Sequence, residues 1–333
     1  MKKFQVVGIG NAMVDVLARA EDSFLAEAGI GKGIMQLIDM ERAVELYGKI
    51  GPAREVSGGS AANTIAGIAH LGGRTAYVGK VKDDQLGAIF AHDLRAQGAV
   101  YETAFAPKDA VDETGRCLII VTPDGERSMN TYLGVTEFLT SDDIDVDQMA
   151  EAEWIYLEGY RFDGPESHAA FAKAIAACKA AGGRVSLTLS DPFCVSRHRN
   201  AFREMIKADV DLLFCDRAEM LSMYETDDFD GAMAEAAAEI AIVACTDSAN
   251  GAYILSGGET WHVPAIPTDI VDATGAGDLF AGAFLWALTH GYALEDCGHI
   301  GYIAAAEVIS HIGARPEADL TALIAQAGLR PAT

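Results

Sequence analysis

Residues 271–284 read Val271-Asp-Ala-Thr-Gly-Ala-Gly-Asp-Leu-Phe-Ala-Gly-Ala-Phe284, a glycine-rich turn that runs into an apolar segment with helical periodicity. Small residues leave backbone N–H groups accessible, and the start of a helix attracts negative charge, so Gly275, Ala276 and Gly277 can form an anion hole. Asp278 follows at the start of the helix, where a carboxylate can take a proton from a hydroxyl that attacks a phosphoryl group. Taken alone, the stretch also fits an ordinary helix start with a first-turn acid.

A second glycine motif lies far upstream, in Glu55-Val-Ser-Gly-Gly-Ser-Ala-Ala-Asn63. Its glycines, Gly58 and Gly59, allow a ligand to touch the backbone just before a predicted helix. Ser60 fits the N-cap position of that helix, and Asn63 lies one turn further on the same side. A capped helix without a ligand is the alternative for this motif alone.

Length and composition indicate a folded protein with one large α/β domain and an appendage, or with two domains. The chain has 333 residues, of which 50% are hydrophobic and 22% charged. Its net charge of −24 argues against nucleic acid or an anionic membrane surface as a partner, since both need a basic patch. Nucleotides stay open as ligands, because N–H groups and magnesium can hold them locally. The sequence leaves monomer and homodimer open.

The six cysteines are scattered along the chain without CxxC or Cys/His ligand spacing, which argues against structural zinc. Isolated cysteines favour a reducing, cytoplasmic location with buried thiols. Residues 1–8 lack the apolar core of a signal peptide. There is no run of about 20 apolar residues, so no membrane span is predicted.

Strand and helix patterns alternate along most of the chain, which predicts right-handed βαβ units and a mostly parallel sheet with helices on both faces. The alternation breaks at 12–40 and at 100–134, where Thr122-Pro-Asp-Gly125 predicts a hairpin turn. We therefore expect an α/β fold with a small antiparallel β lid beside the strand ends. The large domain is predicted to comprise residues 1–11, 41–99 and 135–333, and the discontinuous lid residues 12–40 and 100–134.

The sequence does not match two other common phosphate-binding motifs, the dinucleotide-binding fingerprint and the P-loop. Gly8-Ile-Gly-Asn-Ala-Met13 follows a predicted strand, but Met13 replaces the third glycine of the dinucleotide fingerprint and no helix pattern follows. A nicotinamide oxidoreductase is therefore the weakest alternative. The sequence contains no G-x-x-x-x-G-K-[ST] stretch, so a phosphate site must use a device other than a P-loop.

The two glycine motifs together resemble the signatures of the ribokinase-like (PfkB) carbohydrate and nucleoside kinases, Gly-Gly-Ser-x-x-Asn at 58–63 and Asp-x-x-Gly-Ala-Gly-Asp at 272–278. The resemblance covers essentially the whole chain and is strongest to the adenosine kinases within that family. Gly8-Ile-Gly-Asn11-x-x-x-Asp15 and Leu187-Thr-Leu-Ser190-Asp-Pro-Phe193 resemble segments of those enzymes. The resemblance implies a ribokinase-like fold and a reaction that uses ATP and Mg²⁺.

On the substrate side, the resemblance makes Asp278 the catalytic base, the amides of 275–277 the anion hole and Arg127 a lid arginine that reaches the transferring phosphate. Asn11 and Asp15 correspond to the pair that binds the sugar's vicinal hydroxyls, and two acceptor-capable side chains suit a 2′,3′-diol. The remaining substrate residues are Gly59, Ser60, Asn63 and Tyr160. Without the resemblance, Asp15 reads as a strand-end charge, Arg127 as an exposed hairpin residue and Tyr160 as core packing.

On the nucleotide side, the resemblance assigns Thr246, Ser248, Gly251 and Gly277 to the ATP site. Asp216 and Glu219 correspond to a pair that organises Mg²⁺ through water. Asp272 and Thr274 resemble part of a monovalent-cation loop, with K⁺ as the candidate ion.

Three positions depart from the family's pattern on the nucleotide side. Asp216 replaces the asparagine of Asn-x-x-Glu, Ser248 replaces the first glycine of Thr-x-Gly-x-x-Gly, and Tyr302 stands where many adenosine kinases have a histidine. Ser248 costs free energy if the backbone there needs a positive φ. These departures bear on nucleotide affinity and base specificity more than on the reaction type.

We therefore expect a cytoplasmic kinase that uses Mg²⁺ and ATP to phosphorylate a primary hydroxyl of a ribose-containing substrate, foremost the 5′-hydroxyl of adenosine. A free sugar such as ribose or fructose, or a sugar acid, is the alternative substrate. From a different class, Asp216 and Ser248 leave open a nucleoside-binding pseudokinase that does not turn over.

Overall fold

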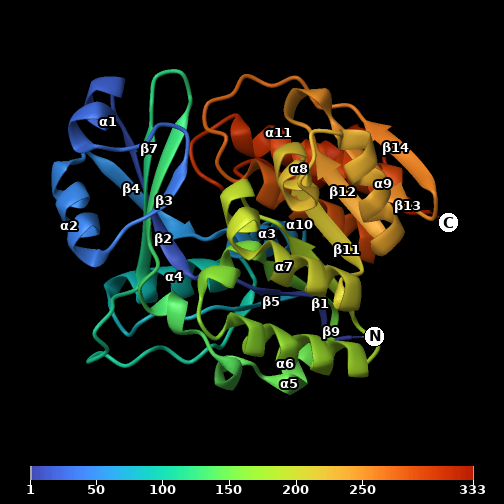
Figure 1. The fold of residues 1–333 in the computed structure, drawn as a ribbon, viewed down its shortest axis with the longest axis horizontal. Coiled ribbons are helices and arrows are strands. Elements are labelled where there is room, and N and C mark those ends of the chain that lie inside the picture. The colour runs from blue at the N-terminus through green and yellow to red at the C-terminus, as the bar shows by residue number, and fades with distance from the viewer. Residues whose placement is uncertain (1, 333) are drawn as a thin grey trace.

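The computed structural model describes residues 2–332, which form two β-sheets surrounded by helices (Figure 1). The larger sheet has the strand order β14-β13-β12-β11-β10-β9-β1-β5-β6. Its strands are β1 (Phe4–Ile9), β5 (Thr75–Val78), β6 (Val100–Tyr101), β9 (Ala152–Glu158), β10 (Arg184–Thr188), β11 (Leu212–Asp216), β12 (Ile242–Thr246), β13 (Ala252–Ser256) and β14 (Glu259–Val263). All pairs from β12 to β6 are parallel, and β13 and β14 add an antiparallel hairpin at one edge.

Helices cover both faces of this sheet because its central strands are apolar on both sides. All residues of β1 are buried, as is typical of a parallel strand between two helix layers. The layer that packs with Val6 contains α3 (Ser60–His70), α4 (Gln85–Ala96), α10 (Ala276–Thr289), α11 (Leu294–Ile309) and α12 (Leu320–Gln326). The layer that packs with Val7 contains α5 (Val146–Ala150), α6 (Ser167–Ala180), α7 (Pro192–Asp209), α8 (Arg217–Tyr224) and α9 (Phe229–Glu239). Short 3-10 helices are η1 (Gly134–Phe138), η2 (Ser141–Asp143), η3 (Gly159–Asp163) and η4 (Ser248–Asn250).

The smaller sheet follows the carboxyl end of β1 and has the strand order β3-β8-β7-β2-β4. Its strands are β2 (Met13–Arg19), β3 (Met35–Leu37), β4 (Ala53–Gly58), β7 (Gly115–Val121) and β8 (Arg127–Tyr132). The β2–β4 and β7–β8 pairs are antiparallel, and the β2–β7 and β3–β8 pairs are parallel. Helices α1 (Asp22–Ala28) and α2 (Met40–Lys49) cover one face of this sheet. The opposite face, called the inner face below, consists of Met13, Leu17, Cys117, Ile119 and Val121 with Val56, Met129 and Leu133 beside them.

The structure confirms the predicted α/β fold class with its mostly parallel sheet and a second, smaller sheet. That smaller sheet is mixed and not wholly antiparallel as predicted, because β2 pairs with β7 and β3 with β8 in parallel. Two strands also pair across the predicted domain division. β4 lies within 41–99, which was assigned to the large domain, yet it pairs with β2 of the smaller sheet. This edge strand reads Ala-Arg-Glu-Val-Ser-Gly and is exposed over half its length, so no apolar alternation marks it in the sequence. β6 lies within 100–134, which was assigned to the lid, yet it pairs with β5 of the larger sheet. The division into two domains stays a prediction.

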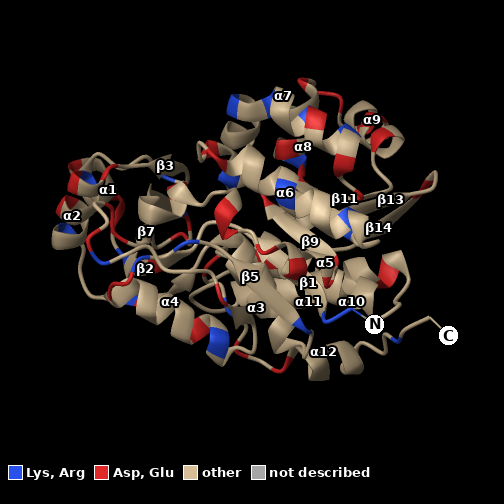
Figure 2. Cartoon of the chain, turned by 90° about the horizontal axis from the view of Figure 1, so that it is seen from below, with Lys and Arg blue, Asp and Glu red and all other residues tan. Residues whose placement is uncertain are grey.

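The surface agrees with the composition. Basic residues are dispersed among more numerous acidic ones on the outer helices (Figure 2). Within residues 2–332, no helix combines the length and the apolar composition needed to cross a bilayer. All six cysteines are free and buried, as predicted.

Candidate active site

A cavity of about 770 Å³ lies between the carboxyl ends of the larger sheet's strands and the inner face. It brings together predicted site residues from along the whole chain, namely Asn11, Asp15, Gly59, Ser60, Asn63, Arg127, Tyr160, Asp216, Glu219, Thr246, Ser248, Thr274, Gly275, Ala276, Gly277 and Asp278. Gly251 and Asp272 lie outside the lining of this cavity. A crevice at the strand ends is where open α/β sheets bind ligands.

Asp278, in the first turn of α10, joins the two glycine motifs. Its Oδ1 accepts a hydrogen bond of 2.6 Å from Ser60 Oγ, and its Oδ2 accepts one of 2.8 Å from Asn63 Nδ2. Burial raises the pKa of Asp278, and the hydrogen bonds from Ser60 and Asn63 act in the opposite direction. A carboxylate with a raised pKa and a fixed orientation is suited to abstract a proton near neutral pH.

The turn before Asp278 leaves part of the predicted anion hole open. Gly275 is the N-cap of α10 with a φ of 83°, and a Cβ there would overlap Ala314, so the position requires glycine. The Ala276 amide donates a long hydrogen bond of 3.4 Å to the carbonyl of Ala273. Within residues 2–332, the amides of Gly275 and Gly277 have no protein acceptor, and a Cβ at Gly277 would meet open space. These two amides are therefore free to bind an anion at the helix N-terminus.

Asn11 and Asp15 lie together on the cavity, but their polarity differs from the expected pair of acceptors. Nη1 of Arg161 donates to Oδ1 of Asn11 at 3.0 Å, so Nδ2 is the free polar atom of Asn11. Asp15 is 6% exposed, and burial raises its pKa to about 7 against the opposing charge of Arg315. A Cβ on Gly58 would overlap the Asp15 carboxylate, which explains this glycine. The pair offers one donor and, when Asp15 is ionised, one acceptor.

Glu158 is a buried site residue that no sequence motif marks. It ends β9 and is 1% exposed. Its Oε1 accepts from the amide of Asn11 at 3.2 Å and its Oε2 from the amide of Ala61 at 2.8 Å. One carboxylate thus anchors the chain after β1 and the first turn of α3, and burial raises its pKa to about 7. From the sequence alone, a glutamate at a strand end is interpreted as a charge exposed to solvent. The role of Glu158 in the site therefore becomes apparent only in the folded structure.

Arg315 is a second residue that the motifs miss. Its guanidinium donates to the carbonyl of Ala62 at 2.6 Å and to that of Ser57 at 3.1 Å, and so ties the chain after α11 to both ends of the Gly58–Gly59 turn. Burial lowers the pKa of Arg315 to about 10, and the negative charges of Asp15 and Asp278 oppose that shift.

Asp216 and Glu219, both predicted to lie at the nucleotide site, line the cavity and form a capping box at the start of α8. Oδ1 of Asp216 accepts from the Glu219 amide at 2.8 Å, and Oε2 of Glu219 accepts from the Asp216 amide at 2.9 Å. One oxygen of each carboxylate remains for a ligand. Burial and the neighbouring Asp216 charge raise the pKa of Glu219 well above its usual range, so a cation would be favoured there.

The acidic groups do not form a complete metal cage. Within residues 2–332, no three His, Cys, Asp or Glu side chains are arranged to hold a metal ion. Mg²⁺ commonly binds through one or two carboxylates, water and substrate phosphates, so Asp216 and Glu219 fit this partial role. The cavity lining contains one guanidinium, that of Arg127, against the carboxylates of Asp15, Glu158, Asp163, Asp216, Glu219 and Asp278.

Ser248 and Tyr302, two of the positions that depart from the family's pattern, contact each other. Ser248 has a φ of 49°, so a non-glycine residue does occupy a left-handed backbone conformation here. The Tyr302 hydroxyl donates to the Ser248 carbonyl at 3.4 Å, and its ring packs edge-on against Phe280. Nearby Thr246 donates weakly to the Cys215 carbonyl at 3.5 Å. Gly251 has a φ of 101° and packs against Val263, so its glycine serves the hairpin rather than the cavity.

The predicted cation loop is closed by its own hydrogen bonds. Asp272 is fully buried, and its Oδ1 accepts from the amide and the hydroxyl of Thr274 at 2.9 and 2.6 Å. Its Oδ2 accepts from the Gly313 amide at 2.9 Å. The role of Asp272 and Thr274 toward K⁺ stays a prediction.

Arg127 and Tyr160 complete the lining from opposite sides. Arg127 begins β8 of the smaller sheet, is partly exposed and forms no ion pair within residues 2–332. Its charge acts on the pKa of Asp278 and of Asp15. Tyr160 lies in η3, and its amide donates to Ser190 Oγ at 3.3 Å. Ser190 has a φ of 73°, a second strained position at the edge of the cavity.

Comparisons with known proteins show which family the chain resembles. The family model for pfkB family carbohydrate kinases matches residues 28–320. A probable sugar kinase from Rhizobium etli CFN 42 is 49% identical with a TM-score of 0.95, over 99% of this chain and 100% of its own. The adenosine kinase from Sinorhizobium meliloti is 47% identical with a TM-score of 0.94, over 98% and 99%. A fructokinase from Escherichia coli is 28% identical over 70% of this chain and 76% of its own.

Proposed function

The chain belongs to the pfkB family of carbohydrate kinases, and from this premise we propose that it transfers the γ-phosphoryl group of ATP to the 5′-hydroxyl of adenosine. Family membership implies a phosphotransferase that uses ATP and Mg²⁺ and acts on an alcohol group. The choice of adenosine, and the role of each residue, are our proposal.

The arrangement around Asp278 is the observation that carries the proposed reaction. Its carboxylate is held by Ser60 and Asn63 directly beside the open amides of Gly275 and Gly277. A hydroxyl placed there can lose its proton to Asp278 while the amides stabilise the charge of the transferring phosphoryl group. Oδ1 of Asn63 is buried without a protein donor within residues 2–332, so it can accept a further hydrogen bond from a ligand.

The apolar wall of the cavity supports a nucleoside over a free sugar. Met13, Met35, Cys117, Ile119 and Met129 line the cavity from the smaller sheet. Leu37, on the same lining, is 47% exposed. A purine base would cover this surface, and burying apolar area contributes roughly 25 cal/mol per Å². A free sugar has no apolar group of comparable size to place there. The 47% identity to an adenosine kinase supports the same choice.

The protein's own residues divide the work of the proposed reaction. Asp15 and Asn11 bind the ribose hydroxyls, and the inner face binds the base. Asp278 orients the 5′-hydroxyl and receives its proton. Arg127, on the hairpin of the smaller sheet, supplies positive charge to the phosphates when the sheet approaches, which also excludes water. Asp216 and Glu219 would hold magnesium through water, and the bound ion would neutralise phosphate charge.

The experiment is a substrate panel with ADP formation as the readout. We expect adenosine to be used with a KM at least about 100-fold below that of ribose or fructose, the difference that about 3 kcal/mol of base burial provides. Met129→Ala should raise the KM for adenosine while leaving slow sugar turnover unchanged. Met205→Ala, which removes a partly buried methionine remote from the cavity, is the matched control.

Two outcomes would replace the proposal. Saturation by ribose or fructose without use of adenosine would make the protein a sugar kinase, in line with the 49% identical probable sugar kinase. Calorimetric binding of adenosine without ADP formation would make it a nucleoside-binding pseudokinase.

A further inference from the structure

We propose that Arg161 is a positioning residue that fixes Asn11 as a hydrogen-bond donor toward the substrate's vicinal hydroxyls, an inference that rests on the proposed function. Arg161 lies in η3, outside the cavity lining, and is 1% exposed. It would therefore act through Asn11 and not by touching the substrate.

The hydrogen bonds of Arg161 determine which end of Asn11 is free. Nη1 donates to Oδ1 of Asn11 at 3.0 Å and to the carbonyl of Thr136 at 2.5 Å, and Nη2 donates to the carbonyl of Leu139 at 3.3 Å. A guanidinium has donors only, so the carboxamide must present its oxygen to Arg161 and its Nδ2 to the cavity. The backbone amide of Asn11 is held from the other side by Glu158. Both the position and the direction of Asn11 are thus fixed.

A fixed direction gives the diol site a defined polarity. Nδ2 of Asn11 can only donate, and the ionised carboxylate of Asp15 can only accept. One hydroxyl of the substrate must then accept from Asn11 and the other must donate to Asp15. An asparagine free to turn could present either atom, and the site would select less strongly for a hydroxyl at that position.

Burying a charged guanidinium at position 161 costs folding free energy, which the orientation of Asn11 would explain. Nε of Arg161 is buried without a partner within residues 2–332. The negative charge of Glu158 compensates part of the burial of this cation. Replacement of buried charged groups by apolar residues of similar volume is often neutral or stabilising. What the arginine adds over an apolar side chain is the direction of its hydrogen bonds.

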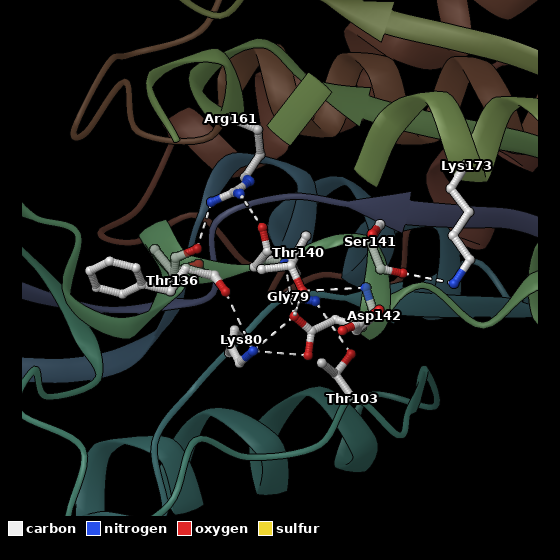
Figure 3. A network of polar contacts seen from close by, with 12 residues as sticks. Gly79, Lys80, Thr103, Thr136, Thr140, Ser141, Asp142, Arg161 and Lys173 are labelled. Atoms are coloured by element: carbon white, nitrogen blue, oxygen red, sulfur yellow. Dashed lines mark hydrogen bonds and ion pairs between the residues drawn. The ribbon is translucent and has the colours of Figure 1, made fainter. Parts of the chain in front are cut away.

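The same guanidinium holds the segment that returns the chain from the smaller sheet, here called the connecting segment (residues 134–143). Figure 3 shows Arg161 on one side of this segment and Lys80 on the other. Lys80 Nζ pairs with Asp143 at 2.8 Å and donates to the Phe138 carbonyl at 3.4 Å. Lys80 therefore anchors the connecting segment without a contact to Asn11, which makes it a matched control.

The test compares Arg161→Met with Lys80→Met on adenosine, 2′-deoxyadenosine and 3′-deoxyadenosine. In the wild type, the analogue that lacks the hydroxyl facing Asn11 should lose about 5- to 150-fold in kcat/KM, because Nδ2 is left unpaired. Arg161→Met should remove most of this preference and bring the kcat/KM ratio of the two substrates to within about twofold, through KM more than kcat. Lys80→Met should show the same preference in kcat/KM as the wild type. Arg161→Lys keeps the positive charge but loses the planar guanidinium, so its preference between the analogues should lie between those of Arg161→Met and Lys80→Met. This variant also serves as the test if Arg161→Met folds poorly.

A second readout is independent of the substrate. The side-chain ¹⁵N order parameter of Asn11 should be about 0.85 in the wild type and in Lys80→Met, and below about 0.6 in Arg161→Met. A rigid Asn11 in Arg161→Met, or an unchanged preference between the adenosine analogues, would overturn the inference. Absence of adenosine turnover in the wild type would instead refute the proposed function, and the order parameter would still decide the role of Arg161.

Discussion

Ser60 donates a hydrogen bond of 2.6 Å from its Oγ to Oδ1 of Asp278, across 218 positions of sequence. Ser60 begins α3 and Asp278 lies in the first turn of α10, so the N-termini of two helices meet at one carboxylate. Helix N-termini favour the ionised form of a carboxylate, and burial disfavours it. The pKa of Asp278 therefore reflects a balance that single substitutions can shift.

Asp278→Asn should lower kcat by roughly 10²–10⁴, the usual contribution of a general base. The shape of the side chain is kept, so adenosine should still bind with a similar Kd by calorimetry. The kcat is measured by ADP formation under saturating substrates. A variant with near-normal kcat would remove Asp278 from the role of base.

Ser60→Ala should move the acid limb of the kcat–pH profile to higher pH. The hydrogen bond from Ser60 lowers the pKa of Asp278, so its loss leaves burial less opposed and the base stays protonated to higher pH. The fall in kcat should thus be larger at pH 6 than at pH 8. Ser186→Ala is the control, because Ser186 is also buried and donates to Ile155 at 2.9 Å but lies outside the cavity. An unshifted acid limb in Ser60→Ala would contradict the expected coupling.

Asp15→Asn should stabilise the free protein at pH 8 while weakening its substrate binding. The folded-state pKa of Asp15 is raised from 3.8 to about 7, so ionisation costs stability progressively as pH rises through that window. Asparagine does not ionise, so above pH 7 the variant should exceed the wild type in unfolding free energy by up to about 4 kcal/mol. This difference should vanish below pH 3.8, where Asp15 is protonated in both the folded and the unfolded protein. Denaturant unfolding at pH 8 and pH 5 measures the difference.

Asp272→Asn is the counterpart with the opposite expected sign. Asp272 accepts three hydrogen bonds from Thr274 and Gly313, and an asparagine there would lose at least one of them. We expect a loss of about 1–3 kcal/mol in unfolding free energy. If Asp15→Asn also destabilised the protein at pH 8, the raised pKa assigned to the buried Asp15 carboxyl would be wrong.

Ser248→Gly should raise the unfolding free energy by about 1 kcal/mol, because glycine adopts a positive φ without the steric cost that Ser248 bears. Thermal unfolding measures this gain. Ser256→Gly, in β13 at an ordinary φ, should instead cost about 0.5–1 kcal/mol. A loss of stability in both variants would mean that Ser248 is not strained.

The sequence was most informative where chemistry depends on local patterns. The glycines before α3 and α10 and the position of Asp278 at a helix start could be predicted because turns and helical periodicity lie within a few residues. The predicted N-cap of α3 was wrong, because Gly59 occupies that position and the Ser60 hydroxyl bonds to Asp278 instead. The strained φ of Ser248 could be anticipated for the same reason. The fold class followed from the alternation of strands and helices.

The rest depends on contacts between distant segments. Glu158 bonds to the amide of Asn11 from 147 positions away, and Arg161 bonds to its side chain from 150 positions away. Nothing near either residue distinguishes it from a surface charge. The membership of β4 in the smaller sheet is similar, because an exposed polar edge strand has no apolar alternation. The polarity of Asn11 likewise became visible only with its arginine partner.

The cavity is continuous from the inner face to Ser248. On the proposed assignment, the adenosine site and the ATP site lie in one cavity, so a single compound could occupy both. Joining a nucleoside to a polyphosphate chain would make the second binding event intramolecular, with an effective concentration in the millimolar range for a short flexible tether. The affinity of such a linked inhibitor would then report how far apart the two sites lie, and a tether too short to span them would bind no better than its tighter half.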